Sequence, residues 1–361
     1  MRAIVIFPPN PGAQLRELSN IDLRSLGKNE VMVRTIYTGI CGTDRELVNG
    51  LIRHSTPPSG KNFMVLGHEV IGEIIEVGKE VTNFKRGDKV VALVRRGCGK
   101  CVGCRIGRPD LCETGNIKIA GIKAHDGFMT DFFVDKANYL VKIPDNVVGE
   151  DSVLIQPMGD IVKAIRTFLI VAEARFPWTC EDSTYECKNS MVIGSGSTGL
   201  LFSIILKSMG FNVTLVNRRG PTELEDRIVR QIGVDFKVIN DDLEQTDLLV
   251  DTSGSITSLL RVISKVKPNG GIILFGFGVG EETKVSSYLI TDVVYKNILI
   301  MGSVAHAKTH LREAVSYYSM LRNEYLSVFK EMVTNIVTPD NAINYLTGKQ
   351  EGEIKVVIKW T

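Results

Sequence analysis

The sequence lacks the features that would assign the chain to a membrane, to a nucleic acid or to a disordered state. Its 361 residues contain no apolar run near the ~18 residues that cross a bilayer. Neither sign of charge dominates, because 43 Lys and Arg residues oppose 41 Asp and Glu residues for a net charge of +2. This balance supplies no general attraction to nucleic acids or membrane surfaces. With 44% apolar and 23% charged residues, the composition is that of a globular protein, and we expect a small-molecule partner.

The chain also lacks a recognisable targeting segment, and its number of cysteines is odd. The apolar run at its N-terminus stops at Pro8-Pro9, which is too short for the hydrophobic part of a signal peptide, so we expect a cytoplasmic protein. Four of the seven cysteines lie between Cys98 and Cys112, and in a reducing compartment this crowding indicates metal binding before disulfides. Cys180 and Cys187 bracket a polar stretch, and the sequence leaves both a disulfide and two free thiols open there.

The length favours two domains, and the hydrophobic pattern changes along the chain accordingly. The first 150 residues hold short β-branched runs separated by glycine, which predict a β-rich domain. A three- and four-residue spacing of apolar residues from Leu154 to Leu169 predicts a connecting helix, and Ile354–Ile358 predicts a last strand that returns to the first domain. Between them, helical segments alternate with runs that predict a parallel α/β sheet: Met191–Ile193, Val213–Val216, Phe236–Ile239, Leu248–Val250, Ile272–Phe275 and Ile298–Met301.

The clearest metal motif is a C-x2-C-x2-C-x7-C array formed by Cys98, Cys101, Cys104 and Cys112. Four thiolates from one loop complete a tetrahedral zinc sphere and leave no position for substrate, so this zinc is expected to be structural. The alternatives are an iron–sulfur cluster and four free core cysteines, and the Gly, Lys and Arg residues between the cysteines fit a core poorly.

A second, open metal site would need ligands from separate parts of the chain. Cys41 ends a strand-like run, and His68-Glu69 precedes another. Thiolate, imidazole and carboxylate together suit zinc with one position left for water or substrate, although each residue alone is more often structural. Gln156 and Asp160, four residues apart, share one face of the connecting helix, where they line a ligand site or serve as helix-capping groups.

A glycine-rich turn lies directly between the first predicted strand of the second domain and the following helix. This strand–turn–helix setting makes a G-x-G-x-x-G pattern a dinucleotide fingerprint, in which the pyrophosphate sits at the helix N-terminus. The turn consists of Gly194, Ser195, Gly196, Ser197, Thr198 and Gly199.

The residues that follow the second predicted strand indicate which dinucleotide is bound. NAD enzymes usually carry an acidic residue there for the ribose hydroxyls, whereas this chain has Asn217, Arg218 and Arg219. An amide and two guanidinium groups suit a 2′-phosphate, so NADP is favoured. A solvated basic turn is the alternative reading, and nothing in these residues repels NAD.

The order of these motifs resembles the zinc-dependent medium-chain dehydrogenases of the alcohol dehydrogenase superfamily, over essentially the whole chain. Segments such as Asp126–Met129, Phe176–Cys180 and Asn217–Arg219 are similar to the archaeal glucose 1-dehydrogenases. The resemblance implies an α/β fold with a GroES-like β-rich catalytic domain and a Rossmann domain with a doubly wound parallel sheet. The catalytic domain would comprise residues 1–155 and 306–361, with a structural-zinc lobe at 95–115, and the Rossmann domain residues 156–305.

The resemblance also implies roles for single residues. Cys41, His68 and Glu69 would bind a catalytic zinc, with Gln156 as a further ligand, directly or through water. Thr43 would contact the reacting alcohol and relay its proton, and Asp160 would bind a sugar hydroxyl. Two zinc ions per chain, a homotetramer and NADP as cofactor, with NAD left open, complete the expectation. The implied cofactor-binding segments are Ser195–Thr198, Asn217–Arg219, Phe275-Gly276-Phe277 and Ser303-Val304-Ala305.

The expected reaction is oxidation of D-glucose, and of related aldoses, at the anomeric carbon to the aldonolactone. Where the glucose dehydrogenases would carry polar sugar-binding side chains, this chain has Val94, Ile119, Tyr295 and Ala305, three of them apolar. A polyol, threonine or secondary-alcohol dehydrogenase therefore stays open as an alternative. A non-catalytic nucleotide-binding sensor with one zinc is the alternative from another functional class.

Overall fold

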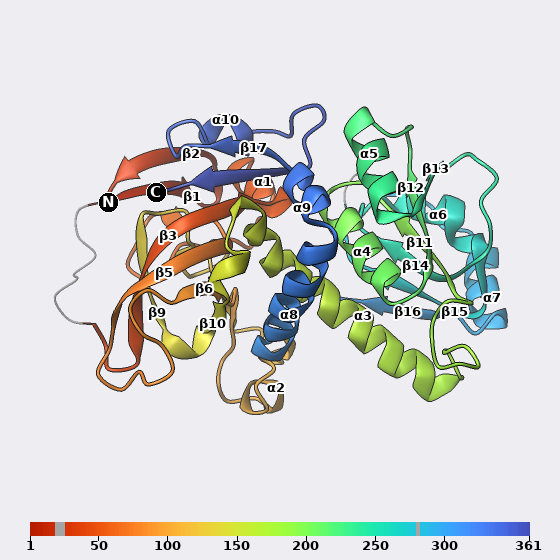
Figure 1. Cartoon of the computed structure of the whole chain (residues 1–361), viewed down its shortest axis with the longest axis horizontal. Coiled ribbons are helices and arrows are strands. Elements are labelled where there is room, and N and C mark those ends of the chain that lie inside the picture. The colour runs from red at the N-terminus through yellow and green to blue at the C-terminus, as the bar shows by residue number, and fades with distance from the viewer. Residues whose placement is uncertain (19–25, 279–281) are drawn as a thin grey trace. The chain divides into compact units, whose positions relative to one another are not determined.

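The computed structural model describes residues 1–18, 26–278 and 282–361, which fold into two compact units (Figure 1). The first unit comprises Met1–Gly159, Ala305–Arg322 and Met332–Thr361, and the second comprises Asp160–Val304 and Asn323–Glu331. This division differs from the predicted one chiefly at Asn323–Glu331, which we expected in the first domain. No helix in the described part of the chain is both long enough and apolar enough to cross a membrane.

The first unit is built on β-sheets, as the short β-branched runs predict. Its largest sheet has the order β10-β6-β5-β3-β18-β17, with β9 paired to β3. The strands of this sheet are β3 (Glu30–Ile40), β5 (Glu69–Val77), β6 (Lys89–Ala92), β9 (Phe132–Lys136), β10 (Leu140–Ile143), β17 (Val333–Val337) and β18 (Lys355–Lys359). Two smaller sheets contain β1 (Arg2–Phe7), β2 (Asn10–Glu17) and β4 (Met64–Val65), and β7 (Arg95–Arg96) and β8 (Lys118–Ile119).

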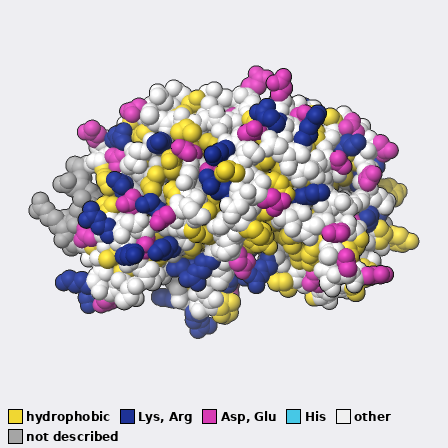
Figure 2. Space-filling model, in the orientation of Figure 1, with side chains coloured by type: hydrophobic (Ala, Val, Ile, Leu, Met, Phe, Trp, Pro, Cys, Tyr) yellow, Lys and Arg dark blue, Asp and Glu magenta, His cyan; other side chains and the backbone are white. Residues whose placement is uncertain are grey.

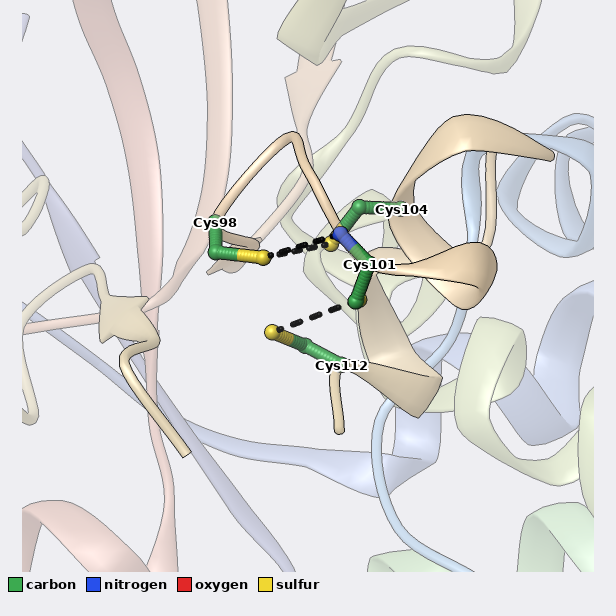
Figure 3. Close-up of side chains that lie close together, drawn as sticks. All are labelled: Cys98, Cys101, Cys104 and Cys112. Carbon is green, nitrogen blue, oxygen red and sulfur yellow. Dashed lines mark hydrogen bonds between the residues drawn. The ribbon is translucent and has the colours of Figure 1, made fainter. Parts of the chain in front are cut away.

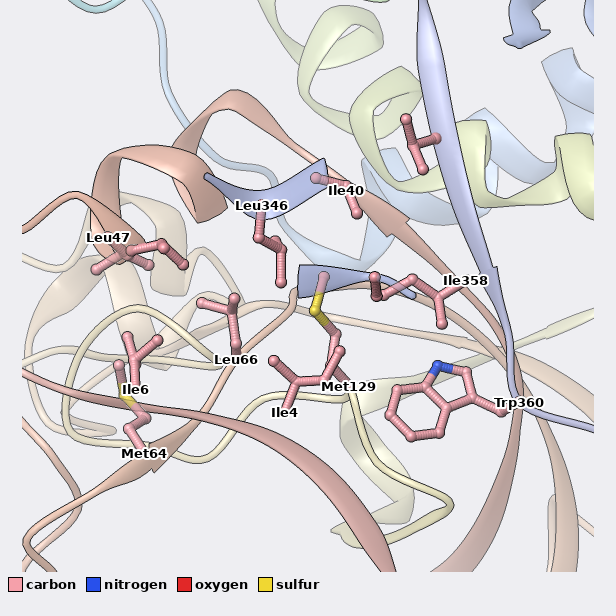
Figure 4. Packing of buried hydrophobic residues seen from close by; sticks show 13 residues of the cluster. Ile4, Ile6, Ile40, Leu47, Met64, Leu66, Met129, Leu346, Ile358 and Trp360 are labelled. Carbon is pink, nitrogen blue, oxygen red and sulfur yellow. The ribbon is translucent and has the colours of Figure 1, made fainter. Parts of the chain in front are cut away.

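The last strand of the chain returns to the first unit, which confirms the prediction for the C-terminus. Strand β18 pairs antiparallel with β3, and Val356 lies opposite Ile40. Figure 4 shows the core that this pairing helps to close, where Ile358 and Trp360 pack with Ile4 and Met129. Burial of such side chains contributes about 1.5–3 kcal/mol each, so the two ends of the chain stabilise one core. The helices of this unit are α1 (Gly42–Val48), α2 (Val102–Arg105), most of α8 (Lys308–Glu324) and α10 (Ile343–Leu346).

The second unit is a six-stranded parallel sheet with the order β13-β12-β11-β14-β15-β16, which confirms the predicted doubly wound fold. The six predicted strands all form, with shifts at their ends. They are β11 (Asn189–Ile193), β12 (Asn212–Asn217), β13 (Asp235–Val238), β14 (Thr246–Asp251), β15 (Val266–Leu274) and β16 (Leu299–Gly302). Because all strands run the same way, the loops after them meet at one edge, where such sheets bind ligands.

Helices connect these strands, and most of them follow the predicted pattern. The connecting helix α3 (Ile155–Arg175) begins in the first unit and continues in the second. Helix α7 (Ser287–Tyr295) was not predicted, because its exposed face is apolar like its inner face and no amphipathic pattern marks it. The other helices of this unit are α4 (Ser197–Ser208), α5 (Glu223–Ile232), α6 (Ile256–Val262), α7 (Ser287–Tyr295) and α9 (Leu326–Met332), whose last residue lies in the first unit.

Cys180 and Cys187 form a disulfide, which settles the choice that the sequence leaves open. The bond closes a short turn before β11. Restricting so short a loop in the unfolded chain stabilises the folded state by about 2–3 kcal/mol. We therefore expect the double variant Cys180→Ser, Cys187→Ser to unfold at a lower temperature in calorimetry, with an unchanged zinc content. Equal unfolding temperatures for the variant and the parent protein would contradict a stabilising role.

Candidate functional site

Pairing between β3 and β5 brings Cys41, His68 and Glu69 together. In this antiparallel pair Gly39 lies opposite Glu69, so the residue after β3 and the residue before β5 are neighbours. The Sγ of Cys41, a ring nitrogen of His68 and a carboxylate oxygen of Glu69 all lie within 4.8 Å of one another. The histidine and the glutamate are buried, and the cysteine is half-buried. Two segments that are far apart in the sequence therefore form one cluster of metal-ligand types.

Glu69 is held in this cluster by a residue that the sequence analysis missed. Both carboxylate oxygens of Glu69 accept hydrogen bonds from the Nζ of Lys355, at 2.9 and 2.8 Å, and both side chains are buried. Gly39 makes room for the carboxylate, because a Cβ at that position would lie 2.0 Å from an oxygen of Glu69. Burial lowers the pKa of Lys355, but the charge of Glu69 outweighs it and raises that pKa, so the pair is ionic.

His68 is oriented by the first turn of α1. Its Nδ1 lies 3.3 Å from an Asp44 oxygen, not aligned for a hydrogen bond, and the other oxygen of Asp44 accepts a 2.8 Å hydrogen bond from the Cys41 N–H. Burial lowers the pKa of His68, but Asp44 and the Cys41 thiol raise it more, so the net shift is well upward. A carboxylate beside one ring nitrogen directs the other towards a metal, which is how proteins hold histidine ligands.

The donor atoms of this cluster fit a zinc ion. Zinc accepts sulfur, nitrogen and oxygen ligands together, and a catalytic zinc keeps three protein ligands and one open position. The Nδ1 of His68 faces the Oδ1 of Asp44 at 3.3 Å, which leaves the other ring nitrogen for a cation. The three side chains are therefore able to hold a metal with room for a fourth ligand.

The other predicted residues of this site lie on two helices. Thr43 is half-buried in the first turn of α1, two residues from Cys41. Gln156 is buried at the start of α3. Asp160, one turn further along α3, is half-buried and begins the second unit. Their roles towards metal and substrate stay predictions.

The four cysteines of the lobe converge, as their spacing predicts (Figure 3). The sulfur atoms of Cys98 and Cys104 are 3.9 Å apart, and those of Cys101 and Cys112 are 4.0 Å apart. A tetrahedral zinc with Zn–S bonds of about 2.3 Å separates its sulfurs by about 3.8 Å. An iron–sulfur cluster would hold the sulfurs farther apart, because several iron ions lie between them. The spacing therefore favours a single zinc ion.

The surroundings of two thiols in the lobe shift their pKa values in opposite directions. The N–H groups of Lys100 and Cys101 donate to the Sγ of Cys98 and lower the pKa of that thiol to about 5. Burial raises the pKa of Cys104 to about 12. Cys104 is thus the thiol that most needs a cation before it loses its proton.

We expect Cys104→Ala to remove one zinc per chain and to lower the midpoint of thermal unfolding by roughly 10 °C. The remaining three cysteines cannot complete the tetrahedral zinc sphere, so the lobe loses its metal crosslink. The Cys41 cluster keeps its ligands, so stability is lost before catalytic activity. Elemental analysis and calorimetry measure the two effects. A variant with full zinc content and the parent's unfolding temperature would rule out a structural site.

The glycine-rich turn of the second unit lies between β11 and α4, in the predicted strand–turn–helix setting. A Cβ on Gly199 would lie 1.8 Å from the carbonyl oxygen of Gly194, so only glycine permits this close turn. A Cβ on Gly196, the N-cap of α4, would meet no atom of the described residues within 4 Å, so these residues leave open space in front of the helix N-terminus. This cradle suits a pyrophosphate, whose charge the N–H groups and the helix dipole stabilise.

The predicted phosphate-binding residues follow β12 at the same edge. Asn217 ends the strand, and Arg218 and Arg219 are exposed after it. A fourth residue, which the sequence analysis missed, joins them: the buried carboxylate of Glu225 in α5 accepts two hydrogen bonds from Arg219. Each of these residues is in the second unit.

The remaining predicted cofactor residues follow β15 and β16. The Phe275 ring packs against Phe202 of α4, with ring centroids 5.0 Å apart, and Phe277 is exposed. Ser303 donates its N–H to the carbonyl of Leu274 at 3.1 Å, which ties the two loops together. Gly276 and Val304 lie in the same two loops, whereas Ala305 begins the next segment of the first unit in a left-handed conformation.

The four positions where we expected polar sugar contacts have different surroundings. Val94 is buried in the first unit, and Ile119 is half-buried in β8 of the same unit. Tyr295 ends α7 in the second unit and is 86% exposed.

Comparisons with known proteins agree with these features. Residues 27–145 match the alcohol dehydrogenase GroES-like domain, and residues 149–360 match the glucose dehydrogenase C-terminus. A glucose 1-dehydrogenase of Metallosphaera sedula is 40% identical over 100% of this chain and 99% of its own length. A glucose 1-dehydrogenase 2 of Caldivirga maquilingensis is 38% identical, with 100% of both chains covered.

A solved structure has the same fold. Haloferax mediterranei glucose dehydrogenase, in complex with NADP, Zn and gluconolactone, superposes with a TM-score of 0.87 at 24% sequence identity. The match covers 100% of this chain and 99% of that one.

Proposed function

Because the chain belongs to the glucose dehydrogenase family of zinc-dependent medium-chain dehydrogenases, we propose that it oxidises D-glucose at the anomeric carbon, with NADP as the hydride acceptor. The product is the aldonolactone. The observation that carries the proposal is the cluster of Cys41, His68 and Glu69 within 4.8 Å, in a chain that is similar over its full length to glucose 1-dehydrogenases. A decayed site would have no chemical reason to keep three ligands of matching types.

The cluster would hold the catalytic zinc, with Gln156 as a further ligand, directly or through water. When bound, zinc acts as a Lewis acid, and it lowers the pKa of an alcohol from its usual high value to near neutrality. Asp44 orients His68, and Lys355 fixes the carboxylate of Glu69, so the protein holds the ligands before the metal arrives. The half-buried Cys41 leaves the cluster open on one side.

Thr43 would receive the proton of the sugar hydroxyl at its Oγ and pass it towards solvent, since its side chain is half-buried beside Cys41. Asp160 would bind another hydroxyl of the sugar. The nicotinamide of NADP supplies the hydride acceptor when bound. The turn from Gly194 to Gly199 would hold its pyrophosphate, and Asn217 and Arg218 its 2′-phosphate.

The experiment for this proposal is a substrate panel with the zinc-loaded protein. NADP⁺ reduction is followed at one concentration of D-glucose, D-galactose, D-xylose, sorbitol, threonine and simple alcohols. The proposal predicts turnover of aldoses, with glucose among the best. Turnover confined to sorbitol, threonine or secondary alcohols would contradict glucose oxidation and favour the alternative dehydrogenases on the same fold. Cofactor binding with no turnover of any of them would favour the sensor.

We also propose two zinc ions per chain, one in the Cys41 cluster and one in the four-cysteine lobe. Five cysteines are free for this purpose.

We propose a homotetramer as well, and one surface of the second unit supports association with further copies. Exposed apolar side chains gather on α7, at the right of the view in Figure 2, and one lies on β16, which is an edge strand of its sheet in the described residues. They are Tyr288, Ile290, Val294, Tyr295 and Ile300. Ile300→Lys should reduce the mass measured by light scattering, whereas a monomeric parent protein would contradict the proposal.

A further inference from the structure

A buried carboxylate joins three parts of the nucleotide-binding edge. Glu225 lies in the first turn of α5 and is 4% exposed. It accepts hydrogen bonds from the Ser195 hydroxyl at 2.6 Å and from the Thr222 N–H at 2.7 Å. Two nitrogens of Arg219 donate to it, at 2.6 and 2.9 Å. Such a bidentate pair is strong and fixes the guanidinium in one plane.

This network reaches the two elements that would contact the cofactor. Ser195 belongs to the glycine-rich turn, and its Oγ accepts a 2.5 Å hydrogen bond from the Nδ2 of Asn217. Asn217 ends β12, where the ribose of a dinucleotide binds in this fold. Glu225 therefore connects the pyrophosphate turn, the ribose position and the guanidinium of Arg219 through one set of hydrogen bonds.

The network compensates the positive charge of Arg219 but not that of Arg218. Burial raises the pKa of Glu225, but Arg219 and Ser195 outweigh it and lower that pKa to about 2, so the carboxylate is ionised throughout the neutral range. The charge of Arg219 is thus compensated by Glu225. Arg218 is exposed, and in the described residues its guanidinium has no hydrogen bond or ion pair.

We propose that Glu225 is a positioning residue that sets the preference between NADP and NAD. By neutralising Arg219, it leaves Arg218 as the cation whose full charge meets a 2′-phosphate. The Arg219–Glu225 pair then forms a rigid, neutral border that accepts the unphosphorylated ribose of NAD as well. The proposal rests on the proposed function, because it assumes that this edge binds a dinucleotide.

The direction of the effect follows from the charge of the phosphate. A buried negative charge beside the ribose repels a 2′-phosphate and leaves the hydroxyl of NAD almost unaffected. Removing that charge without changing the shape of the side chain should strengthen NADPH binding by about tenfold, the ratio that corresponds to ~1.4 kcal/mol, and leave NADH binding unchanged. The preference for NADP should increase accordingly.

The test uses Glu225→Gln in the full-length, zinc-loaded protein. Glutamine keeps the size of the side chain and serves equally in the capping box that begins α5. The dissociation constants of NADPH and NADH are measured by cofactor fluorescence, without sugar. We expect the ratio of the NADH constant to the NADPH constant to rise by about tenfold. An unchanged ratio overturns the proposal, because a residue that only stabilises α5 would weaken both cofactors alike.

Glu223→Gln is the matched control. Glu223 lies in the same first turn of α5, but its side chain is exposed. Its replacement removes the same charge from the same helix, so the ratio should stay at the parent's value. An equal increase in both variants overturns the proposal, because general electrostatics of the helix would then explain it.

Two arginine variants keep the proposal testable should Glu225→Gln fail to fold. Arg218→Ala should weaken NADPH binding by about tenfold or more and spare NADH. Arg219→Ala leaves the charge of Glu225 uncompensated beside the ribose, so it should weaken NADPH binding at least as much and also spare NADH. An equal weakening of NADPH and NADH binding by either variant overturns the proposal. If the parent protein binds NADPH and NADH and only the predicted changes of their affinity ratio are absent, the proposed function stands and the role of Glu225 does not. If the parent protein binds neither cofactor, the proposed function and the role of Glu225 are both wrong.

Discussion

Replacing Cys41 with serine should lower kcat/KM for glucose oxidation by about a thousandfold, because a Lewis acid supplies several kcal/mol of stabilisation to the reacting oxygen. Serine is nearly the size of cysteine, but its hydroxyl is a poor zinc ligand at neutral pH. The variant should lose one zinc per chain and keep its NADPH affinity, since all predicted cofactor residues except Ala305 lie in the second unit. Steady-state kinetics, elemental analysis and NADPH fluorescence measure these three effects.

The double variant Cys180→Ser, Cys187→Ser is the control for Cys41→Ser. It removes two sulfur atoms from the second unit and should keep both zinc ions and the parent's kcat/KM at moderate temperature. Unchanged turnover in Cys41→Ser would contradict the assignment of the catalytic metal. Loss of NADPH binding in the same variant would show that the change is a general unfolding.

Lys355→Met should destabilise the metal-free protein by about 3–5 kcal/mol, because it leaves the carboxylate of Glu69 buried without a counter-charge. Bound zinc would compensate that charge, so the loss should be smaller in the zinc-loaded protein. Urea unfolding with and without a chelator measures both values. Adding Glu69→Gln to Lys355→Met removes the unpaired charge and should recover part of the stability.

Lys359→Met is the matched control for Lys355→Met. Lys359 lies in the same strand, β18, but is exposed, and its replacement should change stability by less than about 0.5 kcal/mol. Equal effects of the two variants, or no effect of Lys355→Met in the presence of a chelator, would contradict a role of Lys355 as the counter-charge of Glu69.

Much of the fold was predictable because its signals are local. The alternation of apolar runs and helical segments after Met191 predicts the parallel sheet, and all six strands form. The four cysteines lie within one short loop, so their spacing alone predicts their convergence. The turn from Gly194 to Gly199 is likewise defined by the strand before it and the helix after it.

The missed residues depend on contacts between distant parts of the chain. Lys355 meets Glu69 across 286 residues, through the pairing of β18 with β3 and of β3 with β5, and no local pattern encodes that register. Glu225 lies in a helix whose charged residues read as a solvated face, and only the fold turns its side chain inward to Ser195. Helix α7 was not predicted because apolar residues lie on its exposed face as well as on its inner face, so its sequence lacks an amphipathic pattern.

We propose that the Cys41 cluster holds the metal on which sugar oxidation by this chain depends. The most direct measurement is NADP⁺ reduction with D-glucose while zinc is returned to the metal-free Cys104→Ala variant, in which the lobe cannot compete for the ion. We expect activity to rise with zinc and to saturate at one ion per chain. Full activity without zinc, or no activity once one zinc ion per chain and NADP⁺ are bound, would contradict this assignment.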